Sequence, residues 1–184
     1  MRHPLSLHQD SRCFAATHID VEIRRPHVDG LALSYLVTGK IDELRIPPVT
    51  ATARSDELWR HTCFEAFIRA SSGGAYYEFN FAPSTHWAAY RFSGYRSGMR
   101  VADEISAPPI AVQASADCYT LQVSLELDRL FDLSRKTSWR LGLSAVIEDT
   151  IGRKSYWALA HPAGQPDFHH PDCFAHEFSP AVLS

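Results

Sequence analysis

The segment TCFEAFIRASSGGAYYEFNFAP, residues 62–83, contains two runs of alternating side chains on either side of one turn. The turn is Ser71-Ser72-Gly73-Gly74, and small polar residues and glycines favour the tight bend of a β-hairpin. A loop centred between Ser72 and Gly73 fixes which residues oppose each other across the hairpin. The apolar pairs on one face are then Phe64 with Phe81, Ala66 with Phe79 and Ile68 with Tyr77. This pattern predicts an antiparallel hairpin with that register.

The same period-two alternation continues through most of the chain. Apolar residues alternate with polar ones over 19–23, 31–37, 119–127 and 139–147, and the turn Asp29-Gly30 joins the first two runs. Weaker strands are expected near 99–105, 109–114 and 155–161, and a short helical turn near Leu127 to Phe131. Helix-period patterns are nearly absent. We therefore predict an all-β fold, an antiparallel β-sandwich of about ten strands with at most one or two short helical turns.

Composition indicates one globular domain over residues 1–184. The hydrophobic fraction of 45% and the charged fraction of 21% are typical of globular proteins, and no apolar window reaches the length of a spanning helix. A net charge of −3 without a basic stripe argues against nucleic acid or membrane as partner. The N-terminal residues lack a secretory pattern, and the four cysteines are widely spaced. We therefore expect reduced thiols in a cytoplasmic protein.

The second face of the hairpin carries polar groups beside aromatic ones. The predicted register sets Glu65 against Asn80 and Phe67 against Glu78, so the two glutamates lie diagonally, at a backbone separation of roughly 7 to 8 Å. Such a pair could bind a ligand, act as the acid and base of a glycosidase, or be held structurally by an arginine. A plain solvent face would rarely mix these residue types, so we expect a functional surface here.

The strand HWAAYRF, residues 86–92, is expected to extend this surface. Placing Ala88, Tyr90 and Phe92 on the apolar side puts Trp87 and Arg91 beside Glu78 and Asn80. A tryptophan offers an aromatic surface to the apolar side of a sugar ring, and charged groups bind its hydroxyls. The face thus has the composition of a saccharide-binding site.

The runs ELWRHTCFEAFI (57–68) and YYEFNFAP (76–83), followed by a tryptophan and an arginine, resemble the DOMON-like superfamily, in particular its branch similar to carbohydrate-binding module family 9 and its uncharacterised bacterial members. The resemblance implies an antiparallel β-sandwich that holds a saccharide between two tryptophans, with a Glu and an Arg on its hydroxyls. Related members bind haem. By position it implies Trp59 and Trp157 as the walls, Glu65 as the acid and Arg91 as its basic partner. This chain has Phe64 where an acidic residue is expected.

The segment HPAGQPDFHHPDCF, residues 161–174, has three prolines that stiffen it and several groups that bind ligands or metals. Strand parity puts His161 on the same face as Trp157, so we expect this segment to form a pocket rim to which Asp167 and His169 contribute. A structural loop, a metal site and a haem site with Met99 as an axial ligand are the alternatives. No spacing matches a known zinc signature.

The function predicted from these features is that of a non-catalytic domain that binds a small ligand, a sugar or glycan fragment. The alternatives are a haem or metal binder using the His-rich segment, an enzyme acting on a saccharide through Glu65 and Glu78, and a protein-interaction module. No cofactor is predicted by the leading hypothesis, and homo-oligomers stay open. The residues predicted to contact the ligand are Trp59, His61, Glu65, Glu78, Asn80, Trp87, Arg91, Trp157, His161, Asp167 and His169.

Overall fold

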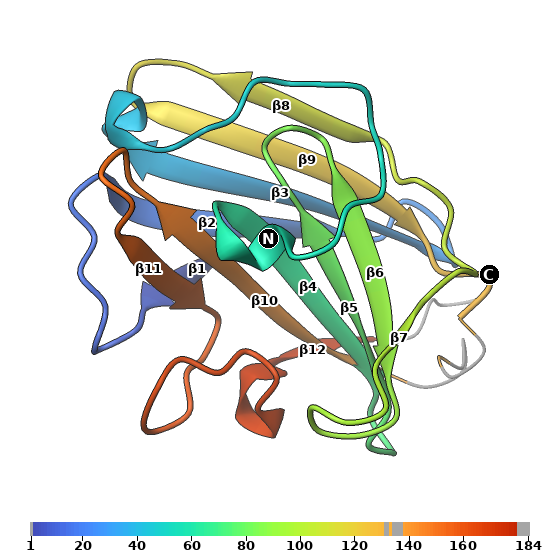
Figure 1. Ribbon diagram of the computed structural model, residues 1–184. Coiled ribbons are helices and arrows are strands. Elements are labelled where there is room, and N and C mark those ends of the chain that lie inside the picture. Colours follow the sequence, from blue (N-terminus) through green and yellow to red (C-terminus); the bar gives the residue numbers. More distant parts are fainter. Residues whose placement is uncertain (1, 131–132, 134–137, 180–184) are drawn as a thin grey trace.

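The computed structural model describes residues 2–130, 133 and 138–179, and this part of the chain forms one antiparallel sheet of twelve strands (Figure 1). The predicted all-β fold is confirmed. The strand order is β7-β6-β5-β4-β10-β11-β1-β2-β3-β9-β8, and β12 pairs with β10. The strands are β1 Arg2–Leu7, β2 Ala16–Arg24, β3 Gly30–Gly39, β4 Cys63–Ala70, β5 Tyr76–Phe81, β6 Trp87–Phe92, β7 Arg100–Val101, β8 Ile110–Ala114, β9 Cys118–Glu126, β10 Trp139–Glu148, β11 Lys154–Ala158 and β12 His176–Phe178.

The sheet curls into two layers that pack against each other. In Figure 1, β2, β3, β9 and β8 form the upper layer, and β4, β5, β6, β10 and β11 form the lower one. The strand β1 joins them, because Arg2 to Leu5 pair with β2 whereas Ser6 and Leu7 pair with β11. Apolar residues from both layers form one core, which includes Ile19, Leu33, Phe64 and Leu143.

The predicted hairpin is present with the predicted register. Phe64 pairs with Phe81, Glu65 with Asn80 and Phe67 with Glu78, and Gly73 at the turn has a φ of 110°, a conformation that glycine adopts without strain. The short strands expected near 99–105, 109–114 and 155–161 correspond to β7, β8 and β11.

The helical segments differ from the expected one. Within the described residues there are three one-turn 3-10 helices, η1 Ile41–Glu43, η2 Leu58–Arg60 and η3 Pro171–Cys173, and none is long enough to span a membrane. At the position where a helical turn is expected, Asp128 and Arg129 form a simple turn, and Phe131 lies outside the described residues. The strand β1 was not predicted, because its sequence RHPLSL has no sustained alternation and contains a proline.

A second apolar cluster lies on the outer face of the lower layer, on the side away from the main core. It contains residues of β4, β5, β6, β10 and β11 together with Phe168 and Phe174 from the segment between β11 and β12. That segment packs directly on β10 at Gly142, where an added Cβ would lie 3.0 Å from the carbonyl oxygen of Cys173. The lower layer is therefore buried on both faces, and all six residues of β5 are buried.

Burial on both faces explains two wrong predictions. The prediction that Trp87 and Arg91 lie beside Glu78 is wrong, because Trp87 pairs with Phe81 and Arg91 with Tyr77, on the side of the main core. The prediction of Trp157 as a wall of the site is also wrong, since its side chain lies in the main core and is 5% exposed. An apolar side chain on these strands does not identify the core face, because both faces are apolar.

Candidate functional site

A cavity of about 500 Å³ opens on the outer face of the lower layer, beside the segment between β11 and β12. Its volume lies within the range of small-ligand sites in proteins. Aromatic rings, two acids and three cationic side chains surround it. The principal lining residues are Trp59, Arg60, Glu65, Glu78, Tyr90, Phe92, Arg96, Lys154, Tyr156, Phe168 and His169.

Two buried glutamates, from neighbouring strands β4 and β5, form the floor of the cavity. Glu65 is 3% exposed and its Oε2 accepts a hydrogen bond of 3.3 Å from the Ser144 hydroxyl. Glu78 is 5% exposed and its Oε1 accepts a hydrogen bond of 2.7 Å from the Asn80 amide. Asn80, two residues further along the same face of β5, has no exposed surface and orients that carboxyl group.

The surroundings favour the protonated form of both acids. Burial, followed by the charge of Glu78, raises the pKa of Glu65 well above its ordinary value, and the bond from Ser144 only partly offsets this. Burial raises the pKa of Glu78 to about 7, although the Asn80 amide and the charge of Arg96 oppose the shift. Near neutral pH the floor can therefore donate as well as accept hydrogen bonds.

His169 extends the polar floor toward the loop between β6 and β7. Its Nδ1 lies 2.7 Å from the Tyr76 hydroxyl, which also accepts a bond of 3.3 Å from the backbone N–H of Arg96. In the tautomer that lets Tyr76 donate to Nδ1, Nε2 carries the proton and lies 3.7 Å from Glu78 Oε2. Burial, with a contribution from Arg96, lowers the pKa of His169 to about 4, so the ring is neutral at neutral pH.

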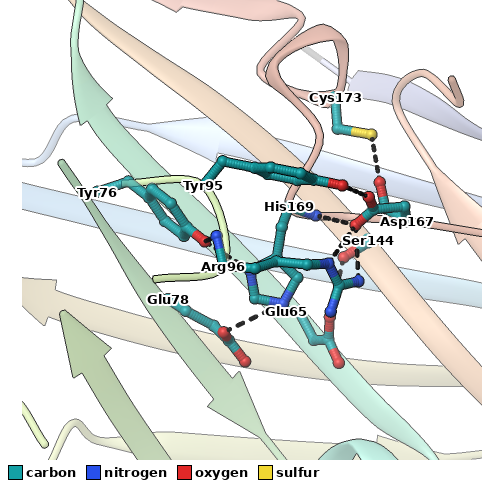
Figure 2. Close-up of polar contacts among 9 residues, drawn as sticks. All are labelled: Glu65, Tyr76, Glu78, Tyr95, Arg96, Ser144, Asp167, His169 and Cys173. Atoms are coloured by element: carbon teal, nitrogen blue, oxygen red, sulfur yellow. Dashed lines mark hydrogen bonds and ion pairs between the residues drawn. The ribbon is translucent and has the colours of Figure 1, made fainter. Parts of the chain in front are cut away.

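Asp167 joins the segment between β11 and β12 to the loop between β6 and β7. Figure 2 shows Tyr95 and Arg96 both reaching this carboxylate. Arg96 Nε and Nη2 donate to Oδ1 at 3.1 and 2.7 Å, the backbone N–H of His169 donates to Oδ1 at 3.1 Å, and the Tyr95 hydroxyl donates to Oδ2. Burial disfavours the charge, but the bonds from Tyr95 and Arg96 outweigh it and hold the pKa of Asp167 below its ordinary value. Asp167 thus acts as a clamp between two loops.

The backbone at Arg96 supports the same arrangement. Its φ of 49° lies in the left-handed region, which is unfavourable for a residue with a side chain. Such a conformation persists when surrounding contacts enforce it, and here the Asp167 ion pair and the Tyr76 hydrogen bond do so. The guanidinium is therefore held at the cavity edge.

Trp59 forms an aromatic wall on the opposite side of the cavity. It lies on η2, after Glu57, whose φ of 61° is also left-handed. The indole ring is 37% exposed and meets the Tyr90 ring edge-on, with centroids 6.0 Å apart. The Tyr90 hydroxyl donates to Asp56 Oδ1 at 2.6 Å, so this ring is fixed from behind.

Four of the predicted ligand residues line the cavity: Trp59, Glu65, Glu78 and His169. Three others lie close to this face without lining the cavity. His61 contacts Glu148 at 2.6 Å, His161 contacts the Ser6 carbonyl oxygen at 2.8 Å, and Asp167 is the clamp.

Several lining residues were not predicted from the sequence. Tyr90 and Tyr156 were missed because strand parity was assigned from hydrophobicity, and the correct parity of β6 and β11 would have identified them. Arg96 lies in a loop, and no local pattern indicates that it reaches Asp167, which is 71 residues away. Lys154 was missed because the strand was expected to begin one residue later.

The histidines and acids of the segment 161–176 point to different neighbours. His169 lies inside the cavity, His170 is near the Tyr95 ring, His161 is beside the His8 ring, and His176 meets the His3 ring. Among the residues that the structure describes, no group of three or more His, Cys, Asp or Glu side chains is placed to hold a metal ion. Met99 does line the cavity with His169, but the floor there is polar rather than the apolar slot that haem requires.

Comparison with known proteins gives matches at the level of three-dimensional structure. No family model and no curated protein matches the sequence. A candidate carbohydrate-binding protein from Bacteroides uniformis superposes with a TM-score of 0.74 at 14% identity, covering 98% of this chain and 86% of that one. The chain shares its fold. A carbohydrate-binding module of family 9 from Caldicellulosiruptor kristjanssonii, in complex with glucose, gives a TM-score of 0.52 at 11% identity, covering 91% of this chain and 78% of that one.

Proposed function

We propose that this protein is a non-catalytic domain that binds a saccharide in the cavity above Glu65 and Glu78. The observation that carries the proposal is the exposed Trp59 ring facing a floor of hydrogen-bonding groups, Glu65, Glu78 and the Nε2 of His169. An aromatic ring packs against the apolar face of a sugar, and the hydroxyls of the sugar both donate and accept hydrogen bonds. A floor whose carboxyl groups can donate when protonated and accept when ionised matches both kinds of hydroxyl hydrogen bond.

The fold supports the same proposal. One protein that shares it is described as a candidate carbohydrate-binding protein, and another was solved in complex with glucose. Membership of the DOMON-like superfamily and a cytoplasmic location are further proposals. The first rests on the sequence resemblance, and the second on the four cysteines, which are all free thiols.

Fluorescence titration with a sugar panel tests the proposal. Of the four tryptophans, Trp59 is the exposed one, so glucose, galactose, mannose, xylose and their short oligomers are expected to change its emission saturably. Glu65→Gln, which replaces one of the two ionisable floor groups with an amide whose donor and acceptor are fixed, is expected to weaken binding at least about tenfold, the equivalent of 1.4 kcal/mol. Glu22→Gln, which replaces a partly exposed carboxylate of β2 that pairs with Arg24, is the matched control. A panel without any saturable signal, or a Glu65→Gln variant that binds like wild type, contradicts the proposal.

A second candidate function is an enzyme that acts on a saccharide with Glu65 and Glu78 as acid and base. The observation that favours it is the pair of buried, mutually interacting carboxyl groups, with the pKa of Glu78 raised to about 7. Release of nitrophenol from nitrophenyl glycosides, abolished in both Glu65→Gln and Glu78→Gln, is the expected result for an enzyme. Binding without turnover favours the non-catalytic function.

A further inference from the structure

A second cavity, of about 370 Å³, lies next to the first and shares Arg96 and Pro166 with it as a common wall. We propose that this cavity is a second sugar subsite, so that the ligand is an oligosaccharide of at least two residues that passes over Arg96. The inference rests on the proposed function of the first cavity. The residues that carry it are Tyr95, Arg96, Gln165, Pro166, Asp167 and His170.

Tyr95 provides an aromatic surface in the second subsite. Its side chain is among the exposed large apolar residues, at 52%, so a face of the ring is open to a ligand. Its hydroxyl is bound to Asp167 Oδ2, and its ring meets His170 edge-on with centroids 6.2 Å apart. A ring fixed at both ends loses little conformational entropy when a sugar packs against it. Tyr95 thus resembles Trp59 in chemistry, at the other end of the combined site.

Arg96 connects the two subsites chemically. Its Nε and Nη2 are used by Asp167, and the remaining Nη1 group has N–H donors for a hydroxyl or ring oxygen on either side of the shared wall. Its guanidinium is held by the ion pair with Asp167 and by its left-handed backbone. A fixed donor at the boundary of two cavities suits the linkage between two sugar units.

The loop of residues 162–166, which lines the second cavity, is also stiffened and polar. It contains Pro162 and Pro166, and Gly164 has a φ of 96°, a turn that glycine allows. Gln165 places an exposed amide, both a donor and an acceptor, in the lining. An exposed aromatic ring with amide and guanidinium groups suits a sugar better than an apolar ligand, which would leave these polar groups unpaired.

Calorimetric titration with sugar ladders tests the inference. Ladders of one to four units of glucose, mannose and xylose are titrated into wild type, Tyr95→Ala, Tyr95→Phe and the control Phe14→Ala, which removes an exposed ring that does not line the second cavity. For the ladder that binds, the dimer is expected to bind more tightly than the monomer, by about two- to tenfold for one aromatic contact. Tyr95→Ala is expected to remove this gain, whereas Tyr95→Phe and Phe14→Ala keep it.

The outcomes separate the two proposals. Equal affinity for monomer and dimer, or a gain that survives in Tyr95→Ala, overturns the second subsite while monomer binding still supports the first. Failure of every ladder member to bind contradicts the proposed function itself, and with it the second subsite. Circular dichroism of Tyr95→Ala and Tyr95→Phe at equal concentration separates loss of the ring from loss of folding.

Discussion

Replacing Glu78 with glutamine is expected to stabilise the protein, and the gain should grow as the pH rises. In the folded protein the carboxyl is buried, and its pKa is raised from 4.5 to about 7. The folded state therefore holds the proton more tightly than the unfolded state. Stability from this group is fully present below about pH 4.5, and it is lost as the pH rises toward 7, because an ionised Glu78 must be kept in a buried site.

The magnitude follows from the size of the shift. A rise of about 2.5 pKa units at 1.36 kcal/mol per unit corresponds to about 3 kcal/mol of lost stability once the pH exceeds 7. At pH 5 the unfolded carboxyl is already mostly ionised whereas the folded one is not, so about 1 kcal/mol is already lost there. Glu78→Gln removes this penalty and keeps an oxygen that accepts the Asn80 hydrogen bond. The stabilisation should therefore increase by about 2 to 3 kcal/mol between pH 5 and pH 8.

Urea denaturation of wild type and variant at pH 5, 6, 7 and 8, followed by tryptophan fluorescence, measures this difference. Glu22→Gln is the control, because Arg24 holds the pKa of the partly exposed Glu22 below its ordinary value and the group stays ionised throughout this range. An increment for Glu78→Gln that is the same at all four pH values would refute the reasoning. So would an increment of the same slope in Glu22→Gln, since that would place its cause outside the cavity.

Three further predictions concern the same site. Burial lowers the pKa of His169 to about 4, so wild type should lose about 2 to 3 kcal/mol of stability between pH 7 and pH 4.5, and urea unfolding of His169→Gln should show a smaller loss. Trp157→Phe should lower the unfolding free energy by about 1 to 3 kcal/mol without changing sugar affinity, whereas Trp59→Phe should weaken sugar binding without changing the unfolding free energy. Calorimetric titration measures the affinity, and thermal melting measures the stability. Asp167→Asn should release Arg96 and weaken sugar binding by about tenfold at unchanged secondary structure, and an unaltered affinity would show that the clamp does not order the site.

Local patterns were sufficient for much of the fold. The register of β4 and β5 follows from a four-residue turn and an alternation of period two, both of which act over a few residues. The diagonal placement of Glu65 and Glu78 on one face is a direct consequence of that register. Trp59 was identified through the family resemblance, and the structure places it at the edge of the same cavity.

The sequence by itself determined most of the strands, the hairpin and the diagonal placement of the two glutamates, because these depend on neighbouring residues and on the two-residue repeat of a strand. The tertiary structure decided which face of β6 meets the cavity. Both faces of that strand are buried, one by the main core and one by the segment between β11 and β12, so hydrophobicity could not distinguish them. The tertiary structure also brought Arg96 to Asp167, since a contact across 71 residues of sequence leaves no local pattern. The sequence therefore predicts the two glutamates of the cavity floor, whereas most residues of the cavity walls are brought together only by folding.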